Sequence, residues 1–278
     1  MKITVNGNEI DFTLEGEKTI GDVIEELRIW LSGTGMLVGD IEIDNQKITL
    51  DEGFSFKKPV EEVKQLSIEA LSIRKSRIRQ LETARDFFTL LTDSAKAKDS
   101  DTLRDLESSY QDLRRILPKI LGEAPDSPIV SGLEETLGQN HQKLISNAAA
   151  MLKILDHRLR EASDPVAEAK IAAAALSRLA ENLDEVAVNF QIGKDKQAMD
   201  AIDELCETLQ KFIRCLTWGA SAAGMDNLIN DINRMLSELE AALVVNDTVL
   251  IGDLLEYELK SKLMELPGKM KFDLTPTQ

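Results

Sequence analysis

The sequence predicts an α+β protein, in which a small β-rich domain precedes an all-α antiparallel helical-hairpin array or bundle of about seven helices. The main observation is a change in the spacing of apolar residues near residue 58. Residues 1–57 contain short alternating stretches around one helical stretch, whereas residues 59–266 follow an almost continuous helical spacing. Aromatic residues make up only 4% of the chain, so the core must be built from aliphatic side chains, which suits closely packed helices.

The chain opens with a predicted β-hairpin. Lys2–Val5 alternates apolar and polar residues, and Asn6-Gly7 follows directly. Because Asn-Gly readily supplies the two positive φ angles of a type I′ turn, residues 9–14 are expected to return antiparallel to the first strand.

A helix and two further strands complete this domain. Thr19 is predicted to be the N-cap, with Asp22 three residues later in a capping-box arrangement. The apolar side chains of the helix recur every three or four residues: Ile20, Val23, Ile24, Leu27 and Leu31. Residues 36–43 and 47–50 are expected to form the two strands that follow.

The order ββαββ is that of a β-grasp fold, and the segment MKITVNGNEIDFTLEGEKTIGDVIEEL resembles the opening of ubiquitin-like β-grasp domains, especially the bacterial sulfur-carrier type. In such carriers the working part is a C-terminal Gly-Gly tail. Here residues 54–59 lead from the domain into a predicted helix, and the chain ends Thr275-Pro276-Thr277-Gln278. The resemblance therefore implies a fold and a binding or assembly module, without the carrier chemistry.

Helical spacing begins after Pro59, a residue that suits the first turn of a helix. The expected helices cover residues 60–94, 101–121, 131–162, 165–193, 195–218, 226–245 and 248–266. The predicted domains are thus a β-grasp domain at 1–58, a helical domain at 59–272 and a tail at 273–278. The Gly- and Pro-rich linker at 122–130 is where the helical domain would be subdivided.

Two junctions between helices look alike. Gly193 and Asn246 can each adopt a left-handed conformation that ends a helix, and a polar residue that can cap the next helix follows each of them. Lys98 and Asp99 form a fainter third copy. This pattern predicts repeated antiparallel hairpins that bury their apolar faces against one another.

No residue pattern indicates a catalytic, cofactor-binding or metal-binding site, and we expect no cofactor and no enzymatic activity. His141 and His157 would be about 24 Å apart on one helix, too far to share a metal ion. Cys206 and Cys215 are expected to be reduced thiols in a cytoplasmic protein, because neither a signal peptide nor a membrane-spanning stretch is apparent. A net charge of −16 argues against binding to nucleic acid or to an anionic membrane.

Six residues are candidate contacts for a partner: Arg74, Lys75, Arg77, Arg79, Trp218 and Tyr257. The four basic residues form a cluster in an acidic chain, which indicates an anionic or acidic partner. The alternative is a set of ion pairs with neighbouring acidic helices. Trp218 and Tyr257 are aromatic anchors of the kind found in interfaces, or else partly buried packing residues.

Residues 246–259 resemble the C-terminal hairpin of bacterial helical proteins of unassigned function, some of them associated with flagellar gene neighbourhoods. The expected function is a non-enzymatic interaction, scaffold or adaptor role, linked to flagellar or secretion machinery, with a protein partner or self-association. One alternative is a carrier or enzyme-associated module related to sulfur-transfer β-grasp proteins. Another is nucleic-acid binding through residues 74–79.

Overall fold

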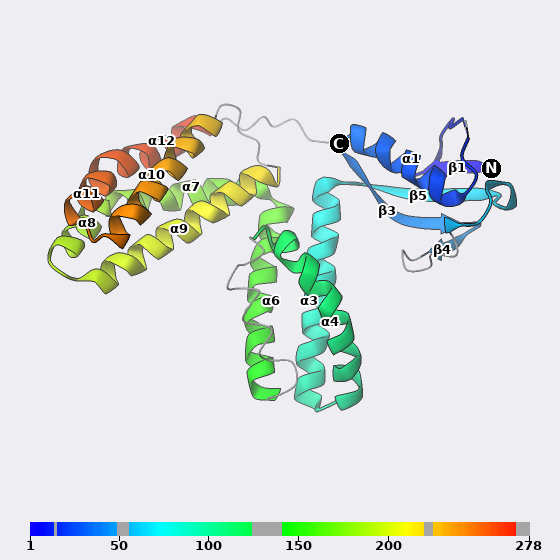
Figure 1. The fold of residues 1–278 in the computed structure, drawn as a ribbon, viewed down its shortest axis with the longest axis horizontal. Coiled ribbons are helices and arrows are strands. Elements are labelled where there is room, and N and C mark those ends of the chain that lie inside the picture. Colours follow the sequence, from blue (N-terminus) through cyan, green and yellow to red (C-terminus); the bar gives the residue numbers. More distant parts are fainter. Residues whose placement is uncertain (14–15, 49–55, 124–140, 220–224, 271–278) are drawn as a thin grey trace. The chain divides into compact units, whose positions relative to one another are not determined.

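The computed structural model describes residues 1–13, 16–48, 56–123, 141–219 and 225–270. The chain divides into two compact units, Met1–Asp86 and Phe87–Gln278. The first contains a β-sheet with one covering helix, and the second is helical, which confirms the predicted α+β class (Figure 1).

The N-terminal sheet has five strands: β1 (Lys2–Val5), β2 (Asn8–Glu9), β3 (Met36–Ile43), β4 (Gln46–Ile48) and β5 (Gln65–Ser72). They lie in the order β2-β1-β5-β3-β4. The central pair, β1 and β5, is parallel, and the other neighbours are antiparallel. Helix α1 (Ile20–Gly33) packs on the sheet, and all five apolar residues of its predicted stripe are buried.

The local signals of this unit are confirmed. Asn6 and Gly7 have φ angles of 51° and 78°, as the predicted hairpin turn requires. The Thr19 side chain accepts a hydrogen bond from the Asp22 amide, and the Asp22 carboxylate accepts one from the Thr19 amide, which forms a complete capping box. The return strand is shorter than expected, since β2 comprises only two residues.

The prediction of a helix from Val60 is wrong for residues 60–72. A short 3-10 turn, η1 (Val60–Glu62), is followed by β5. Leu66 and Ala70 fit helical spacing, but Ile68 is also buried between them, and this alternation of two is that of a strand. This alternation is short and overlaps with helical spacing at Leu66 and Ala70, and the pairing of β5 with β1, some sixty residues earlier, cannot be read from residues nearby. The all-helical part therefore begins at Ile73.

The helices that follow are α3 (Ile73–Ala97), α4 (Ser100–Leu121), α6 (His141–Ser163), α7 (Pro165–Glu181), α8 (Leu183–Gln191), α9 (Asp195–Thr217), α10 (Asp226–Val244), α11 (Thr248–Asp253), η2 (Leu254–Leu259) and α12 (Lys260–Lys269). The helix expected at 165–193 is broken at Asn182, which separates α7 from α8. Helix α4 continues through Pro118 to its predicted end. Residues 131–140, expected to begin the third helix, lie outside the described residues.

Three junctions share one backbone conformation. Lys98, Gly193 and Asn246 have φ angles of 58°, 73° and 54°. At each of them the next residue's amide reaches back to a carbonyl of the helix that is ending, as in a Schellman motif. Asp99 and Asp247 then cap the following helices through their carboxylates, whereas the junction at Gly193 has no side-chain cap.

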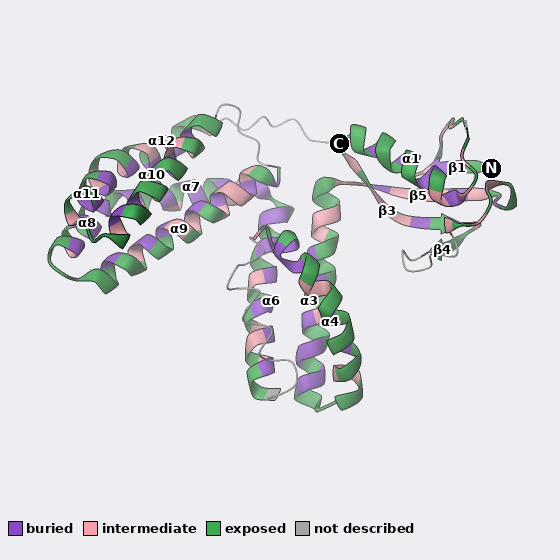
Figure 2. Cartoon of the chain, in the orientation of Figure 1, coloured by how far each residue is buried: buried purple, intermediate pink, exposed green. Residues whose placement is uncertain are grey.

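Residues 248–269 form one continuous rod with a π-helical segment, η2, in its middle. Four of its buried residues, Ile251, Leu255, Leu259 and Leu263, are spaced four apart. In a regular α-helix each step of four turns the side chain about 40° around the axis, so such a series would drift off the core. The wider π turn offsets this drift and keeps the four side chains on one face. Figure 2 shows this pattern of buried inner and exposed outer faces throughout the helical unit.

Candidate interaction surfaces

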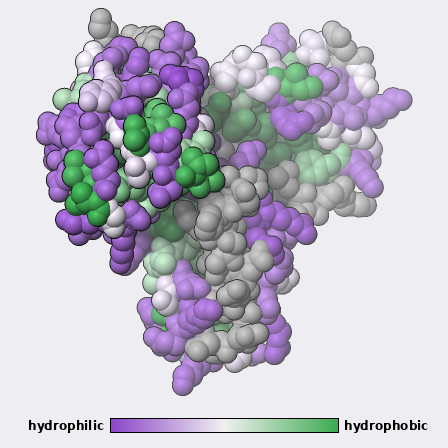
Figure 3. All heavy atoms as spheres, turned by 60° about the vertical axis from the view of Figure 1, so that its left-hand side comes forward, coloured by the Kyte–Doolittle hydropathy of each residue, from purple (hydrophilic) through white to green (hydrophobic). Residues whose placement is uncertain are grey.

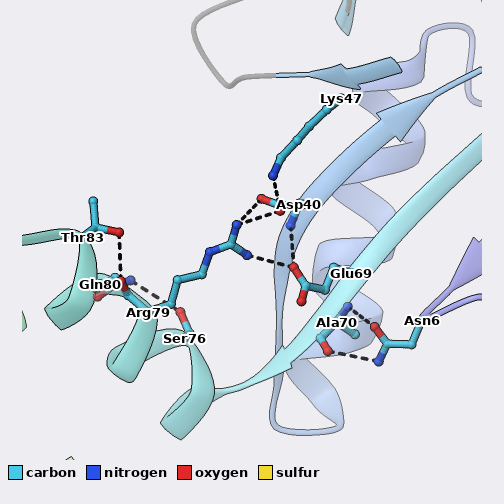
Figure 4. A network of polar contacts seen from close by, with 9 residues as sticks. All are labelled: Asn6, Asp40, Lys47, Glu69, Ala70, Ser76, Arg79, Gln80 and Thr83. Atoms are coloured by element: carbon cyan, nitrogen blue, oxygen red, sulfur yellow. Dashed lines mark hydrogen bonds and ion pairs between the residues drawn. The ribbon is translucent and has the colours of Figure 1, made fainter. Parts of the chain in front are cut away.

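The predicted basic cluster lies at the start of α3, and one of its members is fully engaged in ion pairs. The Arg79 guanidinium contacts both carboxylate oxygens of Asp40 at 2.7 Å and the Glu69 carboxylate at 2.8 Å (Figure 4). Lys47 lies 2.5 Å from Asp40 on its other side. Arg79, and then Lys47, hold the pKa of Asp40 below its usual range. At Arg79 the structure agrees with the ion-pair alternative, but the acidic partners lie on strands β3 and β5 and not on helices.

The other three members of this cluster differ in exposure. Arg74 and Lys75 are exposed, whereas Arg77 is half-buried, and burial lowers the pKa of its guanidinium. The backbone amide of Lys75 donates a hydrogen bond to the Ser72 hydroxyl at the turn from β5 into α3.

The sheet face opposite α1 carries a polar depression of about 540 Å³, lined by residues of β1, β3 and β5. Its polar groups form hydrogen bonds with one another. The Thr4 hydroxyl donates to the Ser67 hydroxyl at 3.0 Å, and the side-chain amide of Gln65 donates to the same hydroxyl. The Asn6 side chain bonds both backbone groups of Ala70 (Figure 4). This face is hydrophilic and offers few apolar anchors to a partner.

The two aromatic candidates, Trp218 and Tyr257, differ in how far their side chains are exposed. Trp218 is only 7% exposed, and its ring covers Gly122, where a Cβ atom would lie 2.9 Å from the Trp218 Cζ2 atom. It is a packing residue and does not offer an exposed contact. Tyr257 is 70% exposed on the outer face of η2, so it remains a candidate contact.

A charged cluster lies at the junction of α4, α6 and α9. We call it the ionic cluster, and it comprises Glu123, Arg158, Glu161 and Arg214. Glu161 is only 2% exposed and accepts hydrogen bonds from Arg158 at 3.1 Å and from Arg214 at 3.0 Å. Arg158 also donates to Glu123 at 2.6 Å and to the Leu121 carbonyl at the end of α4. The two positive and two negative side chains neutralise one another.

A cavity of about 620 Å³ adjoins the ionic cluster, and Lys153, His157 and Lys211 also line it. Lys211 is already paired with Glu168 at 2.5 Å. The four cluster residues come from three separated segments, so sequence spacing gave no sign that they meet. Their mutual pairing fits a structural tie between helices better than a site for a ligand.

A second feature missed by the sequence analysis is an exposed aliphatic surface, which we call the tip patch. It comprises Val188 and Ile192 at the end of α8, Val244 and Val245 at the end of α10, and Val249 and Leu250 in α11. These side chains are between 42% and 81% exposed. Hydrophobic atoms are visible among hydrophilic ones on the helical part that faces the viewer in Figure 3. The sequence signal was present, since aliphatic pairs flank the turn at 246–247, where polar residues are usual.

The two hairpin turns that carry the tip patch lie together because α8 packs against α11 and η2. The position of a Cβ atom on Gly252 would be 3.5 Å from the Gln191 side chain, and Lys260 lies 2.5 Å from Asp184. These contacts fix an antiparallel arrangement in which the end of α8 meets the start of the rod. Between these two contacts α8 advances by seven residues (184 to 191) and the rod by eight (252 to 260), and the rod contains the π turn, which takes up one residue more than an α turn.

The cysteines lead to a first prediction. Burial, and to a lesser extent the nearby Glu161 carboxylate, raise the pKa of the Cys215 thiol to about 12. At pH 9 only about one Cys215 in a thousand is then a thiolate, the reactive form. We expect iodoacetamide at pH 9 to leave Cys215 unmodified in the folded protein and to alkylate it in urea, as followed by peptide mass spectrometry.

The control for this experiment is the Cys206→Ala variant, in which Cys215 is the single thiol. If Cys215 in the folded protein were alkylated as fast as a cysteine in an unstructured chain, its buried position on α9 would be contradicted.

The described ranges contain no group of three or more His, Cys, Asp or Glu side chains placed to hold a metal ion. Within the same ranges, no helix combines the length and the apolar character that crossing a membrane requires.

Comparisons with known proteins match two parts of the chain. Residues 1–72 match a family model described as TP0873 N-terminal domain, and residues 170–268 match one described as a domain of unknown function (DUF8042). No curated protein and no solved structure matches the chain. The first match ends at Ser72, the last residue of β5, and the second contains the whole tip patch. The chain is thus similar to two separate families, one over its sheet unit and one over its C-terminal hairpins.

Proposed function

We propose that this protein is a non-enzymatic adaptor or scaffold that binds a protein partner through its C-terminal helical hairpins. The observation that carries the proposal is the tip patch, in which six aliphatic side chains are exposed on two adjacent turns. Contiguous apolar surface is costly to leave in water, and on a folded protein it commonly marks an interaction site. A flagellar or secretion component is the partner class to look for first, on the resemblance of residues 246–259.

The N-terminal unit serves in this proposal as a second module of β-grasp type. The strand order β2-β1-β5-β3-β4, with a parallel central pair and one covering helix, supports that resemblance. The carrier alternative is less favoured, because β5 ends at Ser72 and α3 begins at the next residue. The end of the sheet unit is therefore part of a helix, whereas a carrier would need a free tail there.

The experiment compares three tagged proteins in pull-downs from the native host, quantified by mass spectrometry. They are the wild type, the patch variant Val245→Ser/Val249→Ser, and the control variant Ile116→Ser/Ile171→Ser. The control residues are also exposed aliphatic side chains, but they lie on α4 and α7. Urea unfolding of all three checks that the fold is unchanged.

We expect one partner to be retained by the wild type and the control, and reduced about tenfold with the patch variant. Equal retention by all three proteins, or no partner retained by the wild type, would contradict the proposal.

A further inference from the structure

The charged residues around the tip patch indicate which side chains a partner would carry. Residues 183–193 and 244–259, which carry the patch, contain six carboxylates, and the nearest cation in the same turn is the exposed Lys194, directly after Gly193. The six are Asp184, Glu185, Asp247, Asp253, Glu256 and Glu258. Asp184 pairs with Lys260, and Asp247 caps α11. Among the described residues, none forms an ion pair with Glu185, Asp253 or Glu256.

These three carboxylates lie beside the aliphatic side chains. Glu185 is one helical turn before Val188, and Asp253 is one turn after Val249. Glu256 lies on η2 opposite the Val188 region of α8, as the antiparallel contacts at 184–260 and 191–252 imply. The tip is thus an aliphatic surface whose rim carries these three carboxylates and, at the α8–α9 turn, the single cation Lys194.

Resting on the proposed function, we infer that the tip patch binds a basic amphipathic segment of its partner, with aliphatic anchors flanked by lysine or arginine. The aliphatic side chains supply burial, and the unpaired carboxylates attract basic residues and set the orientation. A second copy of this chain fits poorly at the tip, because it would bring two acidic rims together. An anionic membrane is disfavoured for the same reason.

The test measures the binding of a labelled 18-residue helical peptide, composed of leucine on one face and lysine on the other, by fluorescence anisotropy. One control peptide has serine for every leucine, and another has glutamate for every lysine. Because the whole chain has a net charge of −16, charge alone attracts any basic peptide. The patch variant therefore keeps the wild-type charge, and the rim variant is compared with a control that loses the same charge elsewhere.

Three variants of the full chain are compared with the wild type. The patch variant is Val245→Ser/Val249→Ser, and the rim variant is Asp253→Asn/Glu256→Gln. The charge control, Glu107→Gln/Asp112→Asn, removes the same charge from the exposed face of α4. We expect the patch variant to lose about tenfold in affinity. We expect the rim variant to lose about threefold at low salt, and the charge control to bind as the wild type does.

The inference is overturned if the serine peptide binds as well as the leucine peptide, or if the glutamate peptide binds better than the lysine peptide. It is also overturned if the rim variant and the charge control weaken binding equally. It is also overturned if sedimentation shows a dimer that the patch variant dissociates, or if anionic vesicles bind the wild type but not the patch variant. A partner lost only with the patch variant in pull-downs, together with no peptide binding, would leave the proposed function standing and remove this inference.

Discussion

Replacing Glu161 by alanine is expected to lower the free energy of unfolding by about 3–5 kcal/mol. Glu161 is buried and accepts hydrogen bonds from both arginines of the ionic cluster. Its loss would leave two guanidinium groups in the interior with only Glu123 to compensate them, and uncompensated buried charge is costly. Urea unfolding followed by circular dichroism measures the change.

Two further variants test whether the loss of stability is specific to the Glu161 carboxylate or follows any substitution in this region. Glu207 lines the same cavity but is exposed, and Glu207→Ala is expected to change stability by less than about 0.5 kcal/mol. Glu161→Gln keeps the shape of the side chain, and its loss of stability should lie between those of Glu161→Ala and Glu207→Ala. A loss of under about 1 kcal/mol for Glu161→Ala would show that the cluster does not tie α4, α6 and α9 together.

Replacing Trp218 by alanine is expected to cost about 3–5 kcal/mol of stability. The ring is buried and covers Gly122 at the end of α4, so its removal leaves a cavity between α4 and α9. Tyr257→Ala is the matched control, because its side chain is 70% exposed, and it should change stability by less than about 0.5 kcal/mol.

The same pair of variants distinguishes packing from binding at the two aromatic positions. If Trp218 were an exposed contact, Trp218→Ala would leave the urea midpoint unchanged and would weaken partner retention alone. Such a result would contradict the structure at the end of α9.

Local signals in the sequence predicted local structure well. The turn at Asn6-Gly7 and the capping box of Thr19 and Asp22 depend on residues close in sequence, and both are present. The stripe from Ile20 to Leu31 is buried as expected. Even the faint junction at Lys98 matches the junction at Asn246, because in both a residue with a positive φ angle is followed by an aspartate that caps the next helix.

Non-local structure was not predictable in the same way. Strand β5 exists because β1 and β3 pair with it, and its own apolar residues fit helical spacing nearly as well. The ionic cluster joins Glu123, Arg158 and Arg214 from segments more than thirty residues apart. Exposure likewise depends on tertiary packing, which buried Trp218 and left Val244, Val245 and Val249 uncovered.

We propose that the protein acts through the exposed hairpin tips of its helical unit. Hydrogen–deuterium exchange of the full chain, with and without its co-purified partner, locates the bound surface along the chain. We expect slower amide exchange at residues 188–194 and 243–252 when the partner is present, with exchange in β1 and β5 unchanged. Protection confined to the sheet face, or to the helices around the ionic cluster, would contradict it.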